Sequence, residues 1–373
     1  AIDFARIVSE LDSVLTRLRG KEVCITWDCD DLVTFEMPDT RIVLAWAEGG
    51  PHRAGGALTV SVGPGSTVVG DPSKNEHDVL CSRLVERILM RFEPSAVLWC
   101  QIEGPVDADM IDELTDAVPE LYSRREAYNV REKGSDAVRT NFAAHMYSEP
   151  FAKLARHPRM IEPVQDLFGE ELYMHQFKIN GKMAFEGDVW QWHQDYGTWL
   201  NDDMMPTERA MNVAIFLDDV NPFNGPLMFI PGSHKKGVVE AKHDLSTTSY
   251  PLWTVDNDLI AQLVERAGGK EGGIVSPTGP AGSMILFHSC LVHASASNLS
   301  PWNRVSVYLS LCAVSNHIRR HKRPEYIAHR DFTPISCLPD DCLVNSYPVD
   351  LPWKGGMPES ALKTSLDVLK EAA

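Results

Sequence analysis

The sequence predicts a mainly β protein with helices, in which a β-sandwich or jelly-roll barrel follows a smaller α+β domain. Apolar segments of strand length recur through the second half of the chain. Clusters of glycine and proline separate these segments, which is typical of sandwiches and barrels. His193 and Asp195 stand two positions apart directly after one such segment, which places a candidate metal site inside the barrel.

Residues 1–122 are expected to form the smaller α+β domain. Apolar residues recur at helical spacing over residues 7–18 and again over residues 80–92. Between them the chain has four strand-like runs bounded by turn residues, at residues 22–27, 32–37, 41–47 and 57–62. We find no residue pattern typical of catalysis here, and the sequence does not assign this domain a role; homodimerisation or docking of a partner stays open.

The boundary between the two domains is expected at residues 123–138, which are charged and turn-prone and would form a linker. The second domain then covers residues 139–373. An alternative boundary stays open. A strand at residues 96–102 and a helix at residues 107–118, ending before Pro119, are also predicted, and both could already belong to the second domain.

The second domain is expected to open with helices over residues 141–156 and 161–168. Six apolar, β-rich segments follow, at residues 172–179, 189–192, 211–217, 227–230, 283–287 and 305–314. An insertion over residues 234–273 interrupts the strands, with a helix expected at residues 257–267. Because it lies between barrel strands, this insertion could cover the mouth of the barrel as a lid.

Composition excludes several classes of partner. The chain of 373 residues has a formal net charge of −17, which argues against nucleic acid and against an anionic membrane surface. No apolar run reaches the ~18 residues of a membrane span, and the first residues carry acids, unlike a signal peptide. The eight cysteines contain no C-x-x-C pair, so we expect reduced thiols in a cytoplasmic protein.

The candidate chemistry begins with His193 and Asp195. In an extended strand, residues i and i+2 point to the same face, so both side chains can reach one metal ion. They would be two members of the 2-His-1-carboxylate triad of non-haem Fe(II) oxygenases. His288 and His293 both stand as candidates for the remaining ligand.

Arg304 helps to choose between these two histidines. It follows His293 at the start of an apolar, strand-like run. An enzyme that uses 2-oxoglutarate needs a cation for the far carboxylate of that molecule. Arginine suits this role because its planar fork pairs with a carboxylate and stays charged when buried. The spacing favours His293 as the ligand and leaves His288 as a supporting or core histidine.

Residues from about 139 to 335 resemble the phytanoyl-CoA dioxygenase family of Fe(II)/2-oxoglutarate oxygenases, and within it the ectoine hydroxylases. The matching segments are residues 175–180, 192–195, 198–199, 204–206, 223–228, 230–234, 279–282, 293–295, 298–301 and Arg304. The resemblance implies a double-stranded β-helix with Fe(II), 2-oxoglutarate and O₂ at its centre. It implies His193, Asp195 and His293 as iron ligands, and Arg304 as the partner of the far carboxylate.

The same resemblance suggests further site residues. Gln176 and Asn180 match positions that line the co-substrate pocket, and Trp199 would pack beside the co-substrate. Lys178 and Tyr308 are candidates for contact with the substrate, as is Tyr196, one of three aromatics near the ligands together with Trp190 and Trp192. We expect these side chains to suit a small zwitterion or carboxylate.

Asp195 also indicates the type of reaction. Halogenating relatives have Ala or Gly at this position, so an aspartate favours hydroxylation. The expected reaction is hydroxylation of an unactivated C–H bond in a small polar metabolite, a free amino acid or similar molecule, with release of succinate and CO₂. Ectoine hydroxylases have Arg where this chain has Lys178, which argues against ectoine itself as substrate.

Two alternative functions remain open. One is a cupin-type metal dioxygenase that does not use 2-oxoglutarate, against which Arg304 argues. The other is a binding protein without catalytic activity on the same fold, against which the intact set of metal ligands argues.

Overall fold

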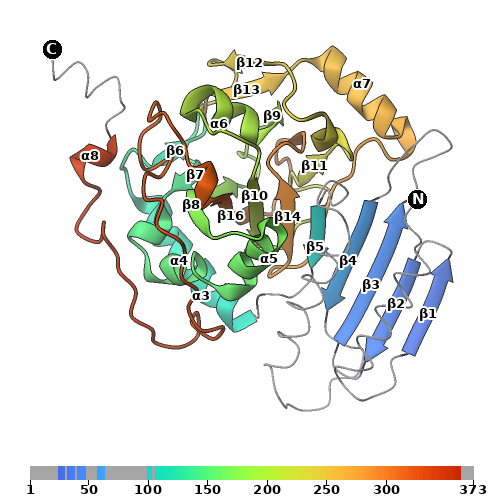
Figure 1. The fold of residues 1–373 in the computed structure, drawn as a ribbon, viewed down its shortest axis with the longest axis horizontal. Coiled ribbons are helices and arrows are strands. Elements are labelled where there is room, and N and C mark those ends of the chain that lie inside the picture. The colour runs from blue at the N-terminus through green and yellow to red at the C-terminus, as the bar shows by residue number, and fades with distance from the viewer. Residues whose placement is uncertain are drawn as a thin grey trace.

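The computed structural model describes the side chains of residue 106 and residues 108–362, except that of residue 271, and the backbone of five earlier strands (Figure 1). The helices expected at residues 7–18 and 80–92 lie outside this described part of the chain.

Four of the early strands form an antiparallel sheet in chain order. Each pairs with the next strand along the chain, as short connections favour. The strands are β1 (Cys24–Cys29), β2 (Leu32–Met37), β3 (Thr40–Ala47) and β4 (Ala57–Gly63). All four overlap runs that the sequence predicts as strands.

A seven-stranded antiparallel sheet forms one wall of the barrel, in the order β5-β14-β10-β16-β8-β7-β6. Its strand β16 is buried throughout, and its side chains alternate between the two faces of the sheet. Val307 and Leu309 join the large hydrophobic core on one face, whereas Tyr308 points to the other face, toward the opposite sheet of the barrel. The strands are β5 (Trp99–Ile102), β6 (Asn129–Arg131), β7 (Val138–Phe142), β8 (Leu172–Lys182), β10 (Ala210–Phe216), β14 (Met284–His288) and β16 (Arg304–Ala313).

A five-stranded sheet forms the opposite wall, in the order β11-β15-β9-β13-β12. Side chains of both walls meet between them, where Phe229 from this sheet packs with Phe287 from the other. The strands are β9 (Trp190–His193), β11 (Leu227–Phe229), β12 (Ala241–Asp244), β13 (Leu252–Val255) and β15 (His293–Ser295). The expected fold class, mainly β with a jelly-roll barrel, is confirmed.

Helices cover the outer face of the seven-stranded sheet (Figure 1). Leu114 of α3, Phe151 of α4 and Ile161 of α5 are buried in one core cluster with Ile179 and Leu309 of the sheet. These three helices are α3 (Ala108–Ser123), α4 (Glu149–Leu154) and α5 (Pro158–Phe168). The other described helices are α6 (Asp195–Asp203), α7 (Asn257–Ala267) and α8 (Glu359–Leu362). The 3₁₀ turns are η1 (Ala144–Met146), η2 (Ser233–Lys236), η3 (Gly269–Glu271) and η4 (Val314–Asn316).

Two helix predictions need correction. The helix expected over residues 141–156 is wrong in its first half: the chain continues as β7 to Phe142, which pairs with Lys178, and α4 starts only at Glu149. Pairing in the sheet overrides local helical spacing there. The helix expected to end before Pro119 runs on to Ser123, because buried Leu121 extends its packing face.

The strand and helix next to the domain boundary contact the barrel. β5 pairs with β14 in the seven-stranded sheet, and α3 belongs to the large core. The range expected to be a linker contains β6, which pairs with β7. These contacts favour the alternative boundary, in which the second domain already starts at β5.

The insertion adds η2, β12, β13, α7 and η3 between β11 and β14. Its strand β13 pairs with β9 beside the candidate site, and α7 covers the five-stranded wall through Ile260 and Leu263. Tyr250 and Leu252 of this segment line the barrel cavity. The insertion therefore contributes to the cavity wall, as expected of a segment over the barrel mouth.

Candidate metal and co-substrate site

His193 and His293 lie opposite each other on the paired strands β9 and β15. Their ring centroids are 4.1 Å apart. In each ring Nδ1 lies close to a backbone carbonyl, that of Gln191 at 2.6 Å and that of Leu291 at 2.9 Å. Because a carbonyl can only accept, each Nδ1 carries the proton, and each Nε2 presents a lone pair to the cavity.

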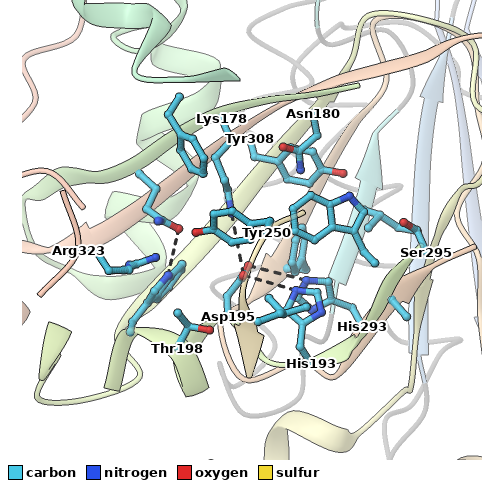
Figure 2. A pocket seen from close by; sticks show the side chains of 18 of the residues that line it. Lys178, Asn180, His193, Asp195, Thr198, Tyr250, His293, Ser295, Tyr308 and Arg323 are labelled. Carbon is cyan, nitrogen blue, oxygen red and sulfur yellow. Dashed lines mark hydrogen bonds and ion pairs between the residues drawn. The ribbon is translucent and has the colours of Figure 1, made fainter. Parts of the chain in front are cut away.

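Asp195 completes this group from the first turn of α6. The chain is still extended at Gln194, with φ −116° and ψ 133°, so His193 and Asp195 reach the same side before the helix begins. The carboxylate oxygens of Asp195 lie 3.8 Å from Nε2 of His193 and 3.8 Å from Nε2 of His293 (Figure 2). Asn212 donates to Oδ2 of Asp195 at 2.8 Å and fixes its orientation.

The protonation states of the three side chains suit a metal ion. Burial lowers the pKa of His193 to about 3, and burial also lowers the pKa of His293. Burial alone would raise the pKa of Asp195, but Lys178, His293 and His193 outweigh it, and that pKa lies below its usual range. At pH 7 the site therefore holds two neutral imidazoles and one carboxylate, the forms that bind metal.

The donor set fits Fe(II). The ligand atoms of His193, Asp195 and His293 all lie within 4.8 Å of one another, and they form the only such group among the described residues. Two imidazole nitrogens and one carboxylate match the facial triad of non-haem iron oxygenases, which leaves positions open toward the cavity.

His288 lies outside this group. Its Nδ1 accepts from the backbone N–H of Cys290 at 3.0 Å, and its ring lies beside His234, with 5.4 Å between centroids. Burial lowers the pKa of His288 to about 4. Of the two histidines that the sequence left as candidates, the structure brings His293 to the other ligands.

One end of the cavity gathers polar atoms that have no partner in the protein. Arg304 is 1% exposed, and its Nε and Nη1 atoms are buried without a hydrogen bond. The hydroxyl of Ser295, which can donate, is also buried without a hydrogen bond, and Ser295 and Asn180 both line the cavity (Figure 2). Buried donors without partners are costly, so this end fits a ligand carboxylate. Arg304 thus lies where the far carboxylate of 2-oxoglutarate is expected.

Gln176 and Trp199 form a bridge in the cavity wall. Trp199 donates from Nε1 to Oε1 of Gln176 at 3.1 Å, and Gln176 donates from Nε2 to the carbonyl of Ile327 at 2.9 Å. Both residues line the cavity. The amide of Gln176 is thus engaged within the protein, and its first task is to orient the indole of Trp199.

Lys178 and Tyr308 line the cavity, as expected of substrate contacts. Nζ of Lys178 lies 4.0 Å from Oδ1 of Asp195 and 5.8 Å from the ring centroid of Tyr308. Tyr196, in contrast to the expectation, does not line the cavity. It is 3% exposed in a separate hydrophobic cluster, and its hydroxyl donates to the carbonyl of Met205. The start of α6 rotates its side chain away from the cavity that Asp195 faces.

The sequence interpretation missed Arg323 and Tyr250, which both line the cavity (Figure 2). Arg323 donates to Asp203 through Nε at 3.0 Å and through Nη2, and Asp203 is fully buried at the end of α6. A hydrogen bond joins Arg323 to Tyr250. The sequence offered only a weak signal for Arg323. It belongs to a basic run, His317 to Arg323, that follows the last core strand of an otherwise acidic chain.

Comparison with known proteins decides the family. A model of the family described as phytanoyl-CoA dioxygenase (PhyH) matches residues 99–306, from β5 into β16. The chain belongs to the phytanoyl-CoA dioxygenase family. The match begins at the strand that joins the barrel, in line with the contacts of β5.

Individual relatives agree with this family. Ectoine dioxygenase of Bordetella bronchiseptica is 36% identical over 222 residues, which is 57% of this chain and 70% of that protein. L-proline trans-4-hydroxylase of Streptomyces griseoviridis is 37% identical over 211 residues, 55% of this chain and 79% of that protein. The crystal structure of EctD from S. alaskensis with bound Fe has a TM-score of 0.56 at 31% identity, covering 64% of this chain and 83% of that chain.

A second crystal structure of EctD from S. alaskensis, with 2-oxoglutarate and 5-hydroxyectoine, has a TM-score of 0.54 at 32% identity and covers 62% of this chain and 79% of that chain. This phytanoyl-CoA dioxygenase family member is an Fe(II)- and 2-oxoglutarate-dependent dioxygenase that uses O₂ and acts on a small molecule. The enzyme class and the cofactors expected from the sequence are confirmed. None of its described helices is both long and apolar enough to cross a membrane.

Proposed function

We propose that this enzyme hydroxylates an unactivated C–H bond of a small amino acid or similar zwitterion, and releases succinate and CO₂. His193, Asp195 and His293 hold the Fe(II) ion, and Arg304 binds the far carboxylate of 2-oxoglutarate. Lys178 and Arg323 bind the carboxylate of the substrate. The names of two relatives, ectoine dioxygenase and L-proline trans-4-hydroxylase, support a substrate of this size and charge.

The charge of the cavity carries this proposal. The cavity lies between the two walls of the barrel, and strands of both sheets contribute to its lining. Its lining includes Lys178, Arg304 and Arg323, whereas Asp195 is its one carboxylate among the described residues. The protein as a whole is strongly acidic, with a formal net charge of −17. A cationic cavity in an acidic protein selects anionic groups.

The two ends of the cavity support two different anionic ligands. In Figure 2, Ser295 and Asn180 lie on one side of Asp195 and Arg323 lies on the other. Arg304 belongs to the first side, since it pairs with Lys182 on the β8–β16 ladder, two residues along β8 from Asn180. Arg323 is anchored at the second side by Asp203. The two guanidinium groups are therefore separate, and the metal ligands lie between them.

Each part of the chain then has a defined task. Bound Fe(II), together with 2-oxoglutarate and O₂, supplies the oxidising power for breaking a C–H bond. Lys178, close to Asp195 on one side and Tyr308 on the other, can hold a substrate carboxylate near the metal. Tyr250 and the surrounding aromatic rings exclude water and offer a surface for an ammonium group.

The proposal is tested by incubating the Fe(II)-loaded enzyme with 2-oxoglutarate and a panel of amino acids and small acids while succinate is measured. We expect one class of substrate to raise succinate formation well above its rate without substrate. The Lys178→Ala variant should raise KM for that substrate and leave the slow turnover of 2-oxoglutarate alone intact. No succinate across the panel, and none from 2-oxoglutarate alone, would contradict the proposal.

Three further expectations belong to this proposal. We place the enzyme in the cytoplasm, which the buried free thiols of Cys290, Cys312 and Cys342 support. We place the start of the catalytic domain at β5, with residues before it as the smaller domain. We also expect that smaller domain to mediate homodimerisation or docking of a partner, which light scattering of the full chain at several concentrations would test.

A further inference from the structure

A β-bulge brings Trp190 to the wall of the cavity. On β9 and β15, His193 lies opposite His293 and Trp190 lies opposite Ser295, so β9 has one residue more than β15 in this stretch. Regular alternation would instead place Gln191 on the same face as His193. The extra residue is a bulge, which redirects side chains. Gln191 donates instead to Asp244 of β12, and Trp190 lines the cavity.

The indole N–H of Trp190 has no partner in the protein. Its Nε1 atom is buried without a hydrogen bond. An indole N–H can only donate, and leaving such a donor buried and unpaired carries an energetic cost. A ligand acceptor in the cavity would remove this cost.

Trp190 lies at the end of the cavity that Arg304 occupies. Its cross-strand neighbour is Ser295, and the next carbonyl along the chain, that of Ala296, accepts from Nζ of Lys182 at 2.7 Å. Lys182 lies directly opposite Arg304 on the β8–β16 ladder. The unpaired N–H of Trp190, the unpaired hydroxyl of Ser295 and the unpaired guanidinium atoms of Arg304 are thus gathered at one end.

The ring of Trp190 packs against two side chains. The guanidinium carbon of Arg139 lies 3.9 Å from the ring centroid, and buried Glu132 neutralises that guanidinium at 3.0 Å. Arg139 also donates to the carbonyl of Val189 at 2.6 Å, which fixes it to the backbone next to Trp190. The ring centroid of Tyr250 lies 5.8 Å from that of Trp190. Such a ring cannot easily rotate its N–H away, so the donor is preorganised.

We propose that the indole N–H of Trp190 donates a hydrogen bond to the far carboxylate of 2-oxoglutarate, beside Arg304. A carboxylate has about four lone-pair sites, more than one arginine fork uses. The inference rests on the proposed function, because it assumes that 2-oxoglutarate binds at the Arg304 end. The bulge in β9 makes Trp190 a determinant of co-substrate choice.

The test is calorimetric titration of the Mn(II)-loaded full chain with 2-oxoglutarate and, separately, with 2-oxobutanoate, which lacks the far carboxylate. Trp190→Phe keeps an aromatic ring against Arg139 but removes the N–H. We expect it to weaken 2-oxoglutarate binding roughly 10- to 100-fold, as for the loss of a hydrogen bond to a charged group. Binding of 2-oxobutanoate should stay unchanged.

Trp192→Phe is the matched control, since it makes the same chemical change on the same strand. Trp192 packs in the hydrophobic cluster of Ile230 and Val255, outside the cavity lining. We expect both ligands to bind this variant as they bind the native protein. Equal loss of both ligands in Trp190→Phe would mean that the ring only shapes the cavity, and no loss would mean that the N–H is unused; either result overturns the inference.

A second measurement uses the native protein and does not depend on a variant that folds. The chain has nine tryptophans, and each gives one indole N–H signal in a ¹⁵N-labelled, Zn(II)-loaded sample. We expect 2-oxoglutarate to move one signal strongly downfield, and 2-oxobutanoate to leave it in place. Identical spectra with the two ligands would overturn the inference. If the native protein binds no 2-oxoglutarate at all, the proposed function fails first, before any substitution is made.

Discussion

His193 and His293 face each other across the β9–β15 ladder, with 4.1 Å between ring centroids and each Nδ1 held by the carbonyl two residues earlier. The two rings therefore have their orientation and tautomer set by backbone atoms before any metal binds. With Asp195 at the start of α6, the ligand set is part of the folded barrel rather than of a flexible loop.

The first prediction concerns the choice of histidine. His293→Ala removes a ligand, whereas His288→Ala changes a ring whose contacts are with Cys290 and His234. We expect Mn(II) to raise the melting temperature of the native protein and of His288→Ala, and to leave that of His293→Ala almost unchanged. A metal-dependent rise that survives in His293→Ala would contradict the assignment.

The second prediction concerns Arg304. Its guanidinium is buried at the end of the cavity with two nitrogen atoms unpaired, so a carboxylate bound there is fully desolvated. Arg304→Gln should raise the dissociation constant of 2-oxoglutarate by at least about thirtyfold. Arg209→Gln is the control, because Arg209 pairs with Glu170 at the surface. Equal affinity in Arg304→Gln and the native protein would exclude this role.

The third prediction concerns Arg323, whose planar fork is held by Asp203. Arg323→Lys keeps the charge but loses the fork, and we expect KM for the substrate to rise about tenfold or more. Turnover of 2-oxoglutarate without substrate should remain near the native rate, because Arg304 is untouched. Lys322→Gln, which removes the pair that the partly exposed Lys322 makes with buried Asp202, serves as the control. A parallel loss of both activities would point to misfolding rather than substrate binding.

The fourth prediction concerns stability in acid. Burial lowers the pKa of His145 from its ordinary value of 6.5 to about 3, and burial lowers the pKa of His157 and of His288 to about 4. Below pH 6.5 the unfolded chain takes up protons that the folded protein refuses. Stability is therefore complete above pH 6.5 and falls as the pH drops toward 4.

The slope of this loss can be attributed to individual residues. Each such histidine contributes up to about 1.4 kcal/mol per pH unit to the free energy of unfolding within that window. His145→Phe keeps the stacking on Phe177. In urea unfolding between pH 6 and pH 4.5, this variant should take up about one proton fewer on unfolding than the native protein, which reduces the slope of the free energy of unfolding against pH. An unchanged slope would show that His145 is protonated in the folded protein.

Local patterns in the sequence were enough to predict most strands of the barrel. Along β8, Gln176, Lys178 and Asn180 point toward the cavity, and Phe177 and Ile179 between them pack under the helices. Such an alternation with a period of two is visible in the sequence itself. The helix expected from residue 141 failed because β7 pairs with β8, and such pairing depends on residues far away in the chain.

The sequence likewise predicted one part of the candidate site and missed another. His193, Asp195, His293 and Arg304 could be proposed from residue type and spacing, because iron and a carboxylate accept few side chains. Tyr196 could not be excluded, since its distance from Asp195 in the chain says nothing about the turn at the start of α6. Arg323 and Asp203 could not be found, because their pairing joins two segments with no shared pattern.

By itself, then, the sequence determined the ligand chemistry and the barrel class, since both depend on residue types and short periods. Only the tertiary structure decided which cation lies at each end of the cavity, and that a single extra residue in β9 turns Trp190 inward. The physical reason is that strand register and contacts between distant segments are set by packing of the whole barrel, which no local stretch contains.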